Sequence, residues 1–387
     1  MITLTLKNIN TKMVALLIIS AVLNSCETAP ISDKSTSELS SSMLSKTVSS
    51  CTKIKNPSSF SLFWGLDEGD TLCLEDGLYT DGLIVPSGVY VKAINRGKAV
   101  FTGGDMEWSS ILEMSGENST VDGLKIHHPD NSTSTVCKIS GRNNTMKNIS
   151  CSHGGSYKHA IPLMISGSGH LIEDSWFYGE GRYVVQCYGG NNITIRRNVA
   201  RWDSTKPHEA YEPNATFSIY ACSDMIIKNN ISFDYGVPET PMKFGGDFYM
   251  PAHADVGVTP NNNQFIGNFA INHAENTSNR RAIRLDPDMP VSGIVIDNFI
   301  VSASDAAFVF SSSSKSTEVK RCSLFNVDYI GANCSGPAII PNIFPLANQE
   351  LIRLDMCAQN ERQSDWCQSD LNLSEYILNF ISTKKLK

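Results

Sequence analysis

The segments Asn144-Thr-Met-Lys-Asn-Ile149 and Ile193-Thr-Ile-Arg-Arg-Asn-Val199 share one phrase, in which an apolar strand is followed by a polar residue and another apolar pair. The phrase recurs along the middle of the chain. Its aligned polar residues are Asp122, Asn148, Asp174, Asn198, Asn230, Asn268 and Asn298. The steps between them are 26, 26, 24, 32, 38 and 30 residues, and a further copy centres on Cys322.

This repeat predicts an all-β solenoid. A step of about 25 residues with two or three short strands is typical of a parallel β-helix, in which one coil cannot bury its apolar residues alone but stacked coils can. Asn at the same bend of each coil can hydrogen-bond neighbouring backbone groups. An antiparallel sandwich or barrel is the alternative, but it would show hairpin turns every 8–12 residues or so.

Composition agrees with a β-rich chain. The 387 residues include 27 Gly, and charged residues make up only 18%, which argues against a helical bundle or coiled coil. Lys and Arg number 32 against 39 Asp and Glu, a net charge of −7. A general nucleic-acid binder would need a basic footprint, so we expect no nucleic-acid partner.

The entry to the repeat carries a family resemblance. Residues 68–79, which read EGDTLCLEDGLY, and residues 82–94 resemble the opening coils of right-handed β-helix proteins of the pectate-lyase-like class. The resemblance spans roughly residues 60–330 and implies a right-handed, single-stranded parallel β-helix. Polysaccharide lyases, hydrolases, epimerases and inactive adhesins share that scaffold, so the resemblance alone assigns no reaction.

The N-terminus reads as an export signal. Lys7 and Lys12 precede an apolar run over residues 13–23, too short to cross a membrane. The run ends Leu23-Asn24-Ser25-Cys26, which resembles a bacterial lipobox and implies lipidation of Cys26. We therefore expect an exported protein anchored by lipid to the bacterial cell envelope. The alternative is an ordinary signal peptide, with Cys26 discarded.

The domain organisation follows from these segments. We expect a signal peptide at 1–26, a Ser/Thr-rich tether at 27–50 and the β-helix domain at 51–345. Residues 346–387 are expected to form a short C-terminal cap over the last coil, because terminal repeats need covering. The protein is expected to be a monomer.

Ten cysteines remain beyond Cys26, an even number in an exported chain, which favours disulfides. Short spacings suggest three pairs, Cys51 with Cys73, Cys322 with Cys334, and Cys357 with Cys367. Cys137 and Cys187 fall on predicted inward strand faces, so we interpret them as small buried apolar residues.

The variable steps predict insertions. The longest are 201–216, 233–254 and 272–281, and shorter ones are 152–160 and 178–183. Each follows the Asn-bearing strand and precedes the next strand, so all should emerge at one edge and wall a groove.

Cations and aromatics gather in these insertions and the strands beside them, which suits an anionic polysaccharide. On the resemblance, elimination from a uronic acid would use Lys or Arg as the base, often with calcium. We predict Lys243 as the base, with Lys206 or His208 as alternatives, and Arg284 as the clamp on the sugar carboxylate. His208 or Tyr211 would protonate the leaving oxygen. The predicted substrate-binding residues are Arg182, Tyr188, Lys206, Tyr220 and Arg281. In the strand 282–286, Ile283 and Leu285 should point inward, while Arg284 and Asp286 point outward.

A calcium site is a further expectation. Asp234, Asp247, Asp255 and Asp286 could supply the several oxygen ligands that calcium prefers, although each could equally be a turn former.

Other functions stay open. Hydrolysis would need paired carboxylates, for which Asp255, Asp286 and Asp288 are candidates. C5-epimerisation begins with the same proton abstraction as elimination. A lipid-anchored carbohydrate-binding adhesin would need no chemistry at all.

Overall fold

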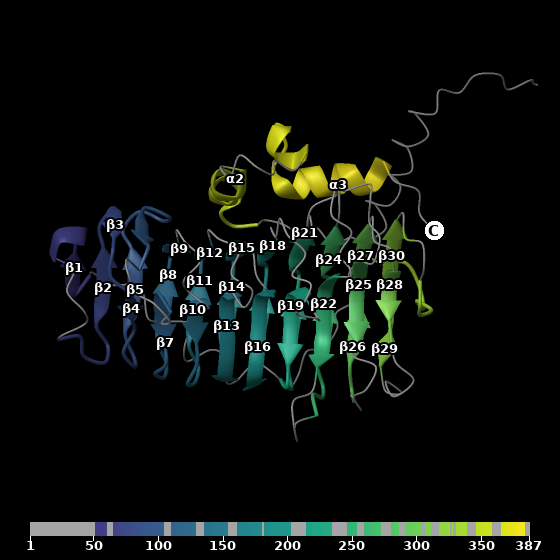
Figure 1. Ribbon diagram of the computed structural model, residues 1–387, viewed down its shortest axis with the longest axis horizontal. Coiled ribbons are helices and arrows are strands. Elements are labelled where there is room, and N and C mark those ends of the chain that lie inside the picture. Colours follow the sequence, from purple (N-terminus) through teal and green to yellow (C-terminus); the bar gives the residue numbers. More distant parts are fainter. Residues whose placement is uncertain are drawn as a thin grey trace, which may run out of the picture. The chain divides into compact units, whose positions relative to one another are not determined.

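The chain folds into the expected parallel β-helix. The computed structural model describes residues 51–59, 65–103, 110–128, 135–153, 161–179, 182–202, 214–233, 246–253, 259–271, 280–285, 292–302, 306–310, 317–325, 327, 330–338, 346–357 and 365–383. Three parallel sheets, here called A, B and C, run the length of a right-handed solenoid (Figure 1). Each coil contributes one strand to sheet A, then one to B, then one to C.

Sheet A has eleven strands among the described residues. They are β1 (Lys53–Lys55), β2 (Thr71–Leu74), β5 (Tyr90–Ala93), β8 (Thr120–Asp122), β11 (Thr145–Lys147), β14 (Leu171–Glu173), β17 (Thr194–Arg196), β20 (Ile226–Lys228), β23 (Gln264–Ile266), β26 (Val295–Asp297) and β29 (Glu318–Val319).

Sheet B contains ten strands over the described part of the chain. They are β3 (Gly77–Tyr79), β6 (Ala99–Phe101), β9 (Lys125–His128), β12 (Ser150–His153), β15 (Trp176–Gly179), β18 (Val199–Trp202), β21 (Ile231–Phe233), β24 (Phe269–Ile271), β27 (Phe299–Ser302) and β30 (Cys322–Phe325).

Sheet C, with nine described strands, is the sheet whose strands vary most in length. They are β4 (Leu83–Ile84), β7 (Leu112–Met114), β10 (Thr135–Ile139), β13 (Ile161–Ser168), β16 (Tyr183–Asn191), β19 (Asn214–Tyr220), β22 (Gly246–His253), β25 (Arg280–Leu285) and β28 (Ala306–Val309).

The inward residues stack in register from coil to coil. In sheet C, one fully buried column runs through Leu112, Cys137, Leu163, Val185, Phe217, Tyr249, Ile283 and Phe308. Tyr249 stacks on Phe217 and donates its hydroxyl to the carbonyl oxygen of Phe269, 3.0 Å away. Complete burial holds its pKa well above the usual value. The sequence placed Tyr249 in an insertion, and it is instead part of the core.

The short turn between sheets A and B, here the A–B corner, contains two columns where one Asn column was predicted. Asn148, Asp174, Asn229 and Asn298 have φ between 51° and 55°, the left-handed conformation of the turn. The next residue of each coil points inward, and Asn198, Asn230 and Asn268 form a buried asparagine ladder there, which Ser175 continues by accepting the backbone N–H of Ile149. Each accepts a backbone N–H from the preceding coil, as in the 2.9 Å bond from Asn230 N to Asn268 Oδ1. The single alignment was therefore wrong by one residue in several coils.

The C-terminal helices lie along the side of the solenoid instead of only over its last coil (Figure 1). The helices are α2 (Gln349–Cys357) and α3 (Leu373–Thr383), with the 3-10 turn η2 (Asp365–Gln368) between them. A second 3-10 turn, η1 (Pro57–Ser59), follows β1 near the other end of the described chain. Asp355 of α2 pairs with Lys125 of β9 at 2.5 Å and accepts the Trp176 indole N–H at 2.9 Å. Arg96 also donates a hydrogen bond to the side chain of Asn348, directly before α2. These contacts join the C-terminal segment to coils near the start of the solenoid.

All ten cysteines of the described chain form disulfides. Cys51–Cys73, Cys322–Cys334 and Cys357–Cys367 confirm the predicted pairs. Cys137–Cys151 and Cys187–Cys222 correct the interpretation of Cys137 and Cys187 as free apolar residues. The alternation of inward and outward residues along a strand correctly predicted that both side chains point inward. It could not show which residue lies opposite each of them across the core. Cys26 lies outside the described residues. No helix within them is long and apolar enough to span a membrane.

Candidate functional site

The predicted insertions all connect sheet B to sheet C, at what we call the B–C edge. They join β12 to β13, β15 to β16, β18 to β19, β21 to β22, and β24 to β25. The expected common edge is thus confirmed. The strands reach further into these segments than predicted, since β19 begins at Asn214 and the stretch 246–253 is strand β22.

Most of the predicted chemistry falls outside the described residues: Lys206, His208, Tyr211, Asp234, Lys243, Asp255 and Asp286. The structure describes Arg182, Tyr188, Tyr220, Arg281 and Arg284, all on sheet C or directly before it. Asp247 is described only as a backbone position in β22. Its place in β22 means that it is not in an insertion.

Two arginines, Arg182 and Arg281, lie at the end of sheet C that adjoins the B–C edge. Arg281 is in register with Asp247 of β22, which continues through Ala215 to Tyr183 of β16. The Arg182 guanidinium lies 5.0 Å from the centre of the Tyr183 ring. Arg182 and Arg281 therefore lie at the same end of the sheet, three strand spacings or roughly 14 Å apart.

Arg284 lies further along β25. Ile283 and Leu285 are buried, as predicted, with exposures of 0% and 1%, and Arg284 between them is partly exposed. Strand alternation then turns Arg284 to the outer face, as expected. It is in register with Val309 of β28. Arg284 thus follows Arg281 on the same strand by three residues, roughly 10 Å.

The outer face of sheet C changes from covered to open along its strands. Gln186 of β16 and Ser218 of β19 are in register on that face, yet their exposures are only 6% and 0%. Two residues later, Tyr188 is 40% exposed. The face is therefore closed toward the B–C edge and open toward the other end of the strands.

Tyr188 and Tyr220 come together at this open end. Their rings stack with centroids 5.2 Å apart and planes 17° from parallel. The two residues are in register, and Tyr220 is in register with His253 of β22. The structure thus brings together two of the predicted substrate-binding residues as one exposed aromatic surface.

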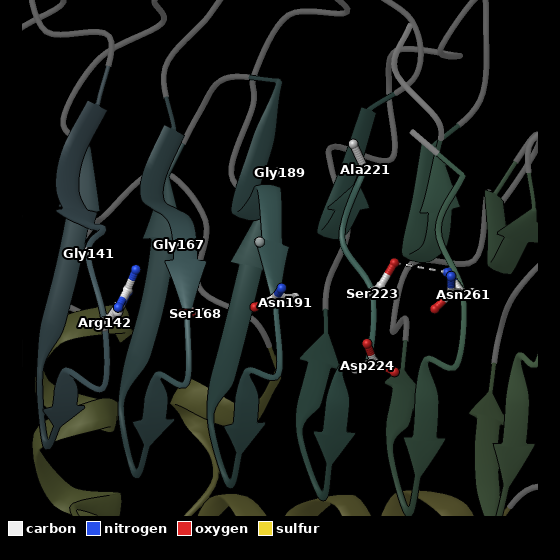
Figure 2. Close-up of a pocket in the computed structure, with 11 residues that line it drawn as sticks. Gly141, Arg142, Gly167, Ser168, Gly189, Asn191, Ala221, Ser223, Asp224 and Asn261 are labelled. Carbon is white, nitrogen blue, oxygen red and sulfur yellow. Dashed lines mark hydrogen bonds between the residues drawn. The ribbon is translucent and has the colours of Figure 1, made fainter. Parts of the chain in front are cut away.

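A hollow of about 510 Å³ lies just beyond these tyrosines, in the turns that lead from sheet C to sheet A, here the C–A corner. Figure 2 shows residues from five consecutive coils around it. The lining consists of Gly141, Arg142, Gly167, Ser168, Gly189, Gly190, Asn191, Ala221, Ser223, Asp224 and Asn261. This hollow was not predicted from the sequence. The available signal was glycine at the same phase of successive coils, at positions 141, 167 and 190.

The C–A corner also holds a buried histidine. His170 is 1% exposed, and its Nδ1 accepts the backbone N–H of Asn144 at 3.1 Å. Its Nε2 lies 2.8 Å from the Ser166 carbonyl oxygen, so the neutral tautomer with the proton on Nε2 satisfies both contacts. Burial lowers the pKa of His170 below its ordinary value of 6.5. This histidine is structural and faces the core side of the turn.

Metal ligands are not grouped in the described part of the chain. No cluster of three or more His, Cys, Asp or Glu side chains that could hold an ion occurs there. Of the four predicted calcium ligands, Asp234, Asp255 and Asp286 lie outside the described residues. In the chain, Asp234 comes before the sheet C strand β22, whereas Asp255 follows β22 and Asp286 follows β25. The calcium site therefore stays a prediction from the sequence.

Comparison with solved structures agrees with the fold. Pectate lyase Pel9A superposes with a TM-score of 0.54 at 16% identity, covering 79% of this chain and 85% of that one. An alginate lyase from Paenibacillus sp. str. FPU-7 gives 0.46 at 12% identity, covering 74% and 98%. Pectin methylesterase PemA from Erwinia chrysanthemi gives 0.41 at 11%, covering 74% and 91%. At these identities the likeness to Pel9A establishes the right-handed parallel β-helix, and the two lower scores carry no argument. No family model and no curated protein sequence matches the chain.

Proposed function

We propose that this protein binds a uronic-acid-containing polysaccharide along the outer face of sheet C and acts on it by β-elimination or C5-epimerisation. The observation that carries the proposal is the convergence at one side of sheet C. Arg182 and Arg281 lie at the B–C edge with every long insertion of the repeat, and Arg284 follows Arg281 by three residues on the same strand.

Cations on this face suit the chemistry of a uronate. Removing the proton beside the sugar carboxylate builds negative charge on that carboxylate, and a guanidinium can bind both of its oxygens through paired hydrogen bonds. Arg284 is our candidate for this role, because it is outward-facing and only partly exposed. Partial exclusion of water strengthens such a contact relative to an exposed one.

The remaining roles are assigned by sequence. Lys243 is proposed as the base, and His208 or Tyr211 as the acid for the leaving oxygen. All three belong to segments 203–213 and 234–245, which connect sheet B to sheet C on either side of β19. Elimination and epimerisation share the proton abstraction and differ in the second step. In elimination the linking oxygen departs, and in epimerisation a proton returns to the opposite face of the ring.

A second candidate function is carbohydrate binding without catalysis. The exposed Tyr188–Tyr220 stack favours it, since aromatic faces present to a sugar ring a surface that needs no acid or base. An adhesive role would use this surface alone, whereas the enzymatic role also requires Arg284.

The test is a panel of uronate polysaccharides offered to the purified protein. New ultraviolet-absorbing unsaturated ends would mark elimination, and deuterium incorporation at C5 without chain cleavage would mark epimerisation. New reducing ends without absorbance would instead mark hydrolysis and contradict the proposal. Binding without any of these products would favour the non-catalytic role.

We also propose that the mature chain is held at the cell envelope by lipid on Cys26. The sequence Leu23-Asn24-Ser25-Cys26 supports this. Labelled palmitate should enter the expressed protein, and Cys26→Ser should abolish labelling and release the protein from membranes. Equal labelling of both proteins would contradict the assignment.

A further inference from the structure

We infer that the hollow at the C–A corner, together with the Tyr188–Tyr220 stack beside it, is an oligosaccharide-binding site separate from the proposed reaction centre. The ligand class is a short chain of hydroxyl-rich pyranose rings. The inference rests on the proposed function only in that both take a carbohydrate. Arg182 and Arg281 adjoin the start of the sheet C strands, and Arg284 lies on β25, a strand that contributes no residue to the lining, whereas the hollow lies where β10, β13, β16, β19 and β22 end.

The floor of the hollow is fixed by the stacking of the coils. At Gly141 a Cβ atom would lie 2.1 Å from the carbonyl oxygen of Gly116, and at Gly167 it would lie 2.2 Å from that of Gly141. Both glycines have positive φ, so a side chain is excluded by conformation as well as by space. At these two lining positions the backbones of adjacent coils therefore approach too closely for a side chain.

Polar side chains line the hollow at one position of each coil. Arg142, Ser168, Asn191 and Ser223 are in register through successive bridges. In Figure 2, Ser223 faces the next coil, where it accepts the backbone N–H of Asn261 at 3.2 Å. Parallel strands repeat at roughly 4.8 Å, which is close to the length of one pyranose unit, so a sugar chain along the solenoid would meet one such group per ring.

Charge in the hollow is sparse and mixed. Arg142 is the lining cation, and its side chain is 70% exposed, with Glu117 no nearer than 3.9 Å. Asp224 is exposed at the same corner. The other polar side chains are hydroxyls and amides, which donate to and accept from sugar hydroxyls. This favours a hydroxyl-rich ligand over a densely charged one.

The aromatic stack adds the second element of a sugar site. Tyr188 directly precedes Gly189, and Tyr220 directly precedes Ala221, and both of these neighbours line the hollow. A Cβ added to Gly189 would meet nothing within 4 Å, so the space beside Tyr188 is open. A ring stacked on the exposed Tyr188 face could thus continue into the hollow without crossing a barrier at this position.

The experiment measures binding by isothermal titration of the full chain with hexasaccharides of galacturonate, of alginate and of cellulose. Ser168→Trp and Asn191→Trp should fill the hollow, and Tyr188→Ala should remove the platform. Both Trp substitutions fall on residues whose backbone groups, rather than side chains, bond the neighbouring coils within the described structure. Each variant should bind the preferred hexasaccharide about tenfold more weakly or worse.

Lys320→Ala is the matched surface control, since Lys320 is 43% exposed and contacts only Glu318 among the ion pairs of the described residues. It should bind as the wild type does. Unchanged affinity in Ser168→Trp, Asn191→Trp and Tyr188→Ala would overturn the site, as would a wild type that binds none of the three probes. Failure of the proposed function would instead appear as absent turnover while these variants still weaken binding.

Discussion

Sheets B and C both present an outer face to their surroundings, and the two faces are built differently. On sheet B the outward residues Trp176, Ile231, Phe269 and Ile300 are large and apolar, and they pack in one buried cluster with α2 and α3. On sheet C the outward column carries Lys138, Met164, Gln186 and Ser218, and two residues further along the strands Tyr188 is exposed beside Tyr220.

This difference separates structural from functional surface within one repeat. Both faces belong to strands that alternate inward and outward residues, so alternation alone treats them alike. What distinguishes them is the outward column. Where the column is apolar, helices of the same chain cover it. On sheet C the polar Gln186 and Ser218 are also covered, but the end of the sheet at Tyr188 stays open to another molecule. Mutations on the two faces should therefore have opposite consequences.

The largest effect is expected from Trp176→Ala on sheet B. The variant loses a nearly fully buried indole and its hydrogen bond to Asp355, so the free energy of unfolding should fall by about 3–5 kcal/mol. Denaturant unfolding followed by circular dichroism measures the change.

Tyr188→Ala is the matched control for that experiment, because it truncates an outward aromatic on sheet C. The stack with Tyr220 is lost, so the expected cost is about 1 kcal/mol. Equal losses of unfolding free energy in the two variants would contradict the proposed difference between the two faces.

Much of the architecture could be predicted because the core repeats. The coil length, the three strands and the edge that carries the insertions follow from periodic apolar residues. The position of the C-terminal helices could not be predicted, since an amphipathic pattern over 373–383 shows that a helix has an apolar side but not which surface receives it. The surface against which α3 packs is formed by one residue from each of several coils.

Arg284→Ala tests the other side of the contrast. Loss of the proposed carboxylate clamp should lower the rate of product formation on the order of 10²-fold. The free energy of unfolding should fall by about 1 kcal/mol or less, well below the loss for Trp176→Ala, because Arg284 is partly exposed. Product assays and denaturant unfolding of the same preparation supply both numbers.

Arg284→Lys sharpens that test. Lysine keeps the charge but cannot make the paired, planar contact, so activity should recover only in part. Full activity in Arg284→Ala would show that this residue takes no part in the mechanism. A large loss of unfolding free energy would show that the outer face of sheet C also stabilises the fold.

The site was less predictable than the fold for a physical reason. Adjacent polar residues such as Arg197-Asn198 and Asn229-Asn230 occupy two different columns, one in the left-handed turn and one pointing inward. Alignment on the nearest polar residue cannot tell them apart, because only backbone conformation and hydrogen bonding separate them. The hollow at the C–A corner was not predicted either. A glycine in the sequence shows that a side chain is absent at that position, but it does not show whether the folded chain leaves a cavity there.

Cys137–Cys151 links sheet C directly to sheet B across the core, so it couples the two contrasting sheets. The residues are 14 positions apart, and replacing both by Ala should lower the free energy of unfolding by about 3 kcal/mol. The pair Cys357–Cys367, 10 positions apart, closes a loop of similar length near the helices. By loop entropy alone the two losses would be nearly equal, so a larger loss for Cys137–Cys151 measures the added coupling through the core. A smaller loss would show that the sheets are held together without it.

The smallest effect is expected at His170, behind the open end of sheet C. Because burial depresses its pKa below 6.5, the unfolded chain binds the proton more readily. This contribution to stability is complete above about pH 6.5 and is lost as the pH falls through the folded-state pKa. Protonated Nδ1 can no longer accept from Asn144, a loss of about 1 kcal/mol.

His170→Asn should remove this pH dependence while keeping the structure. In the preceding coil Asn144 already makes the equivalent pair of contacts, accepting from Ser119 N at 2.9 Å and donating to the carbonyl four residues earlier at 2.7 Å. Asparagine at 170 can do the same without titrating. His127 on sheet B, whose pKa burial also lowers, stays in both proteins and supplies a common background. Melting temperatures between pH 7 and 5 should therefore decline less steeply in the variant, and parallel declines would mean that His170 does not sense pH at this corner.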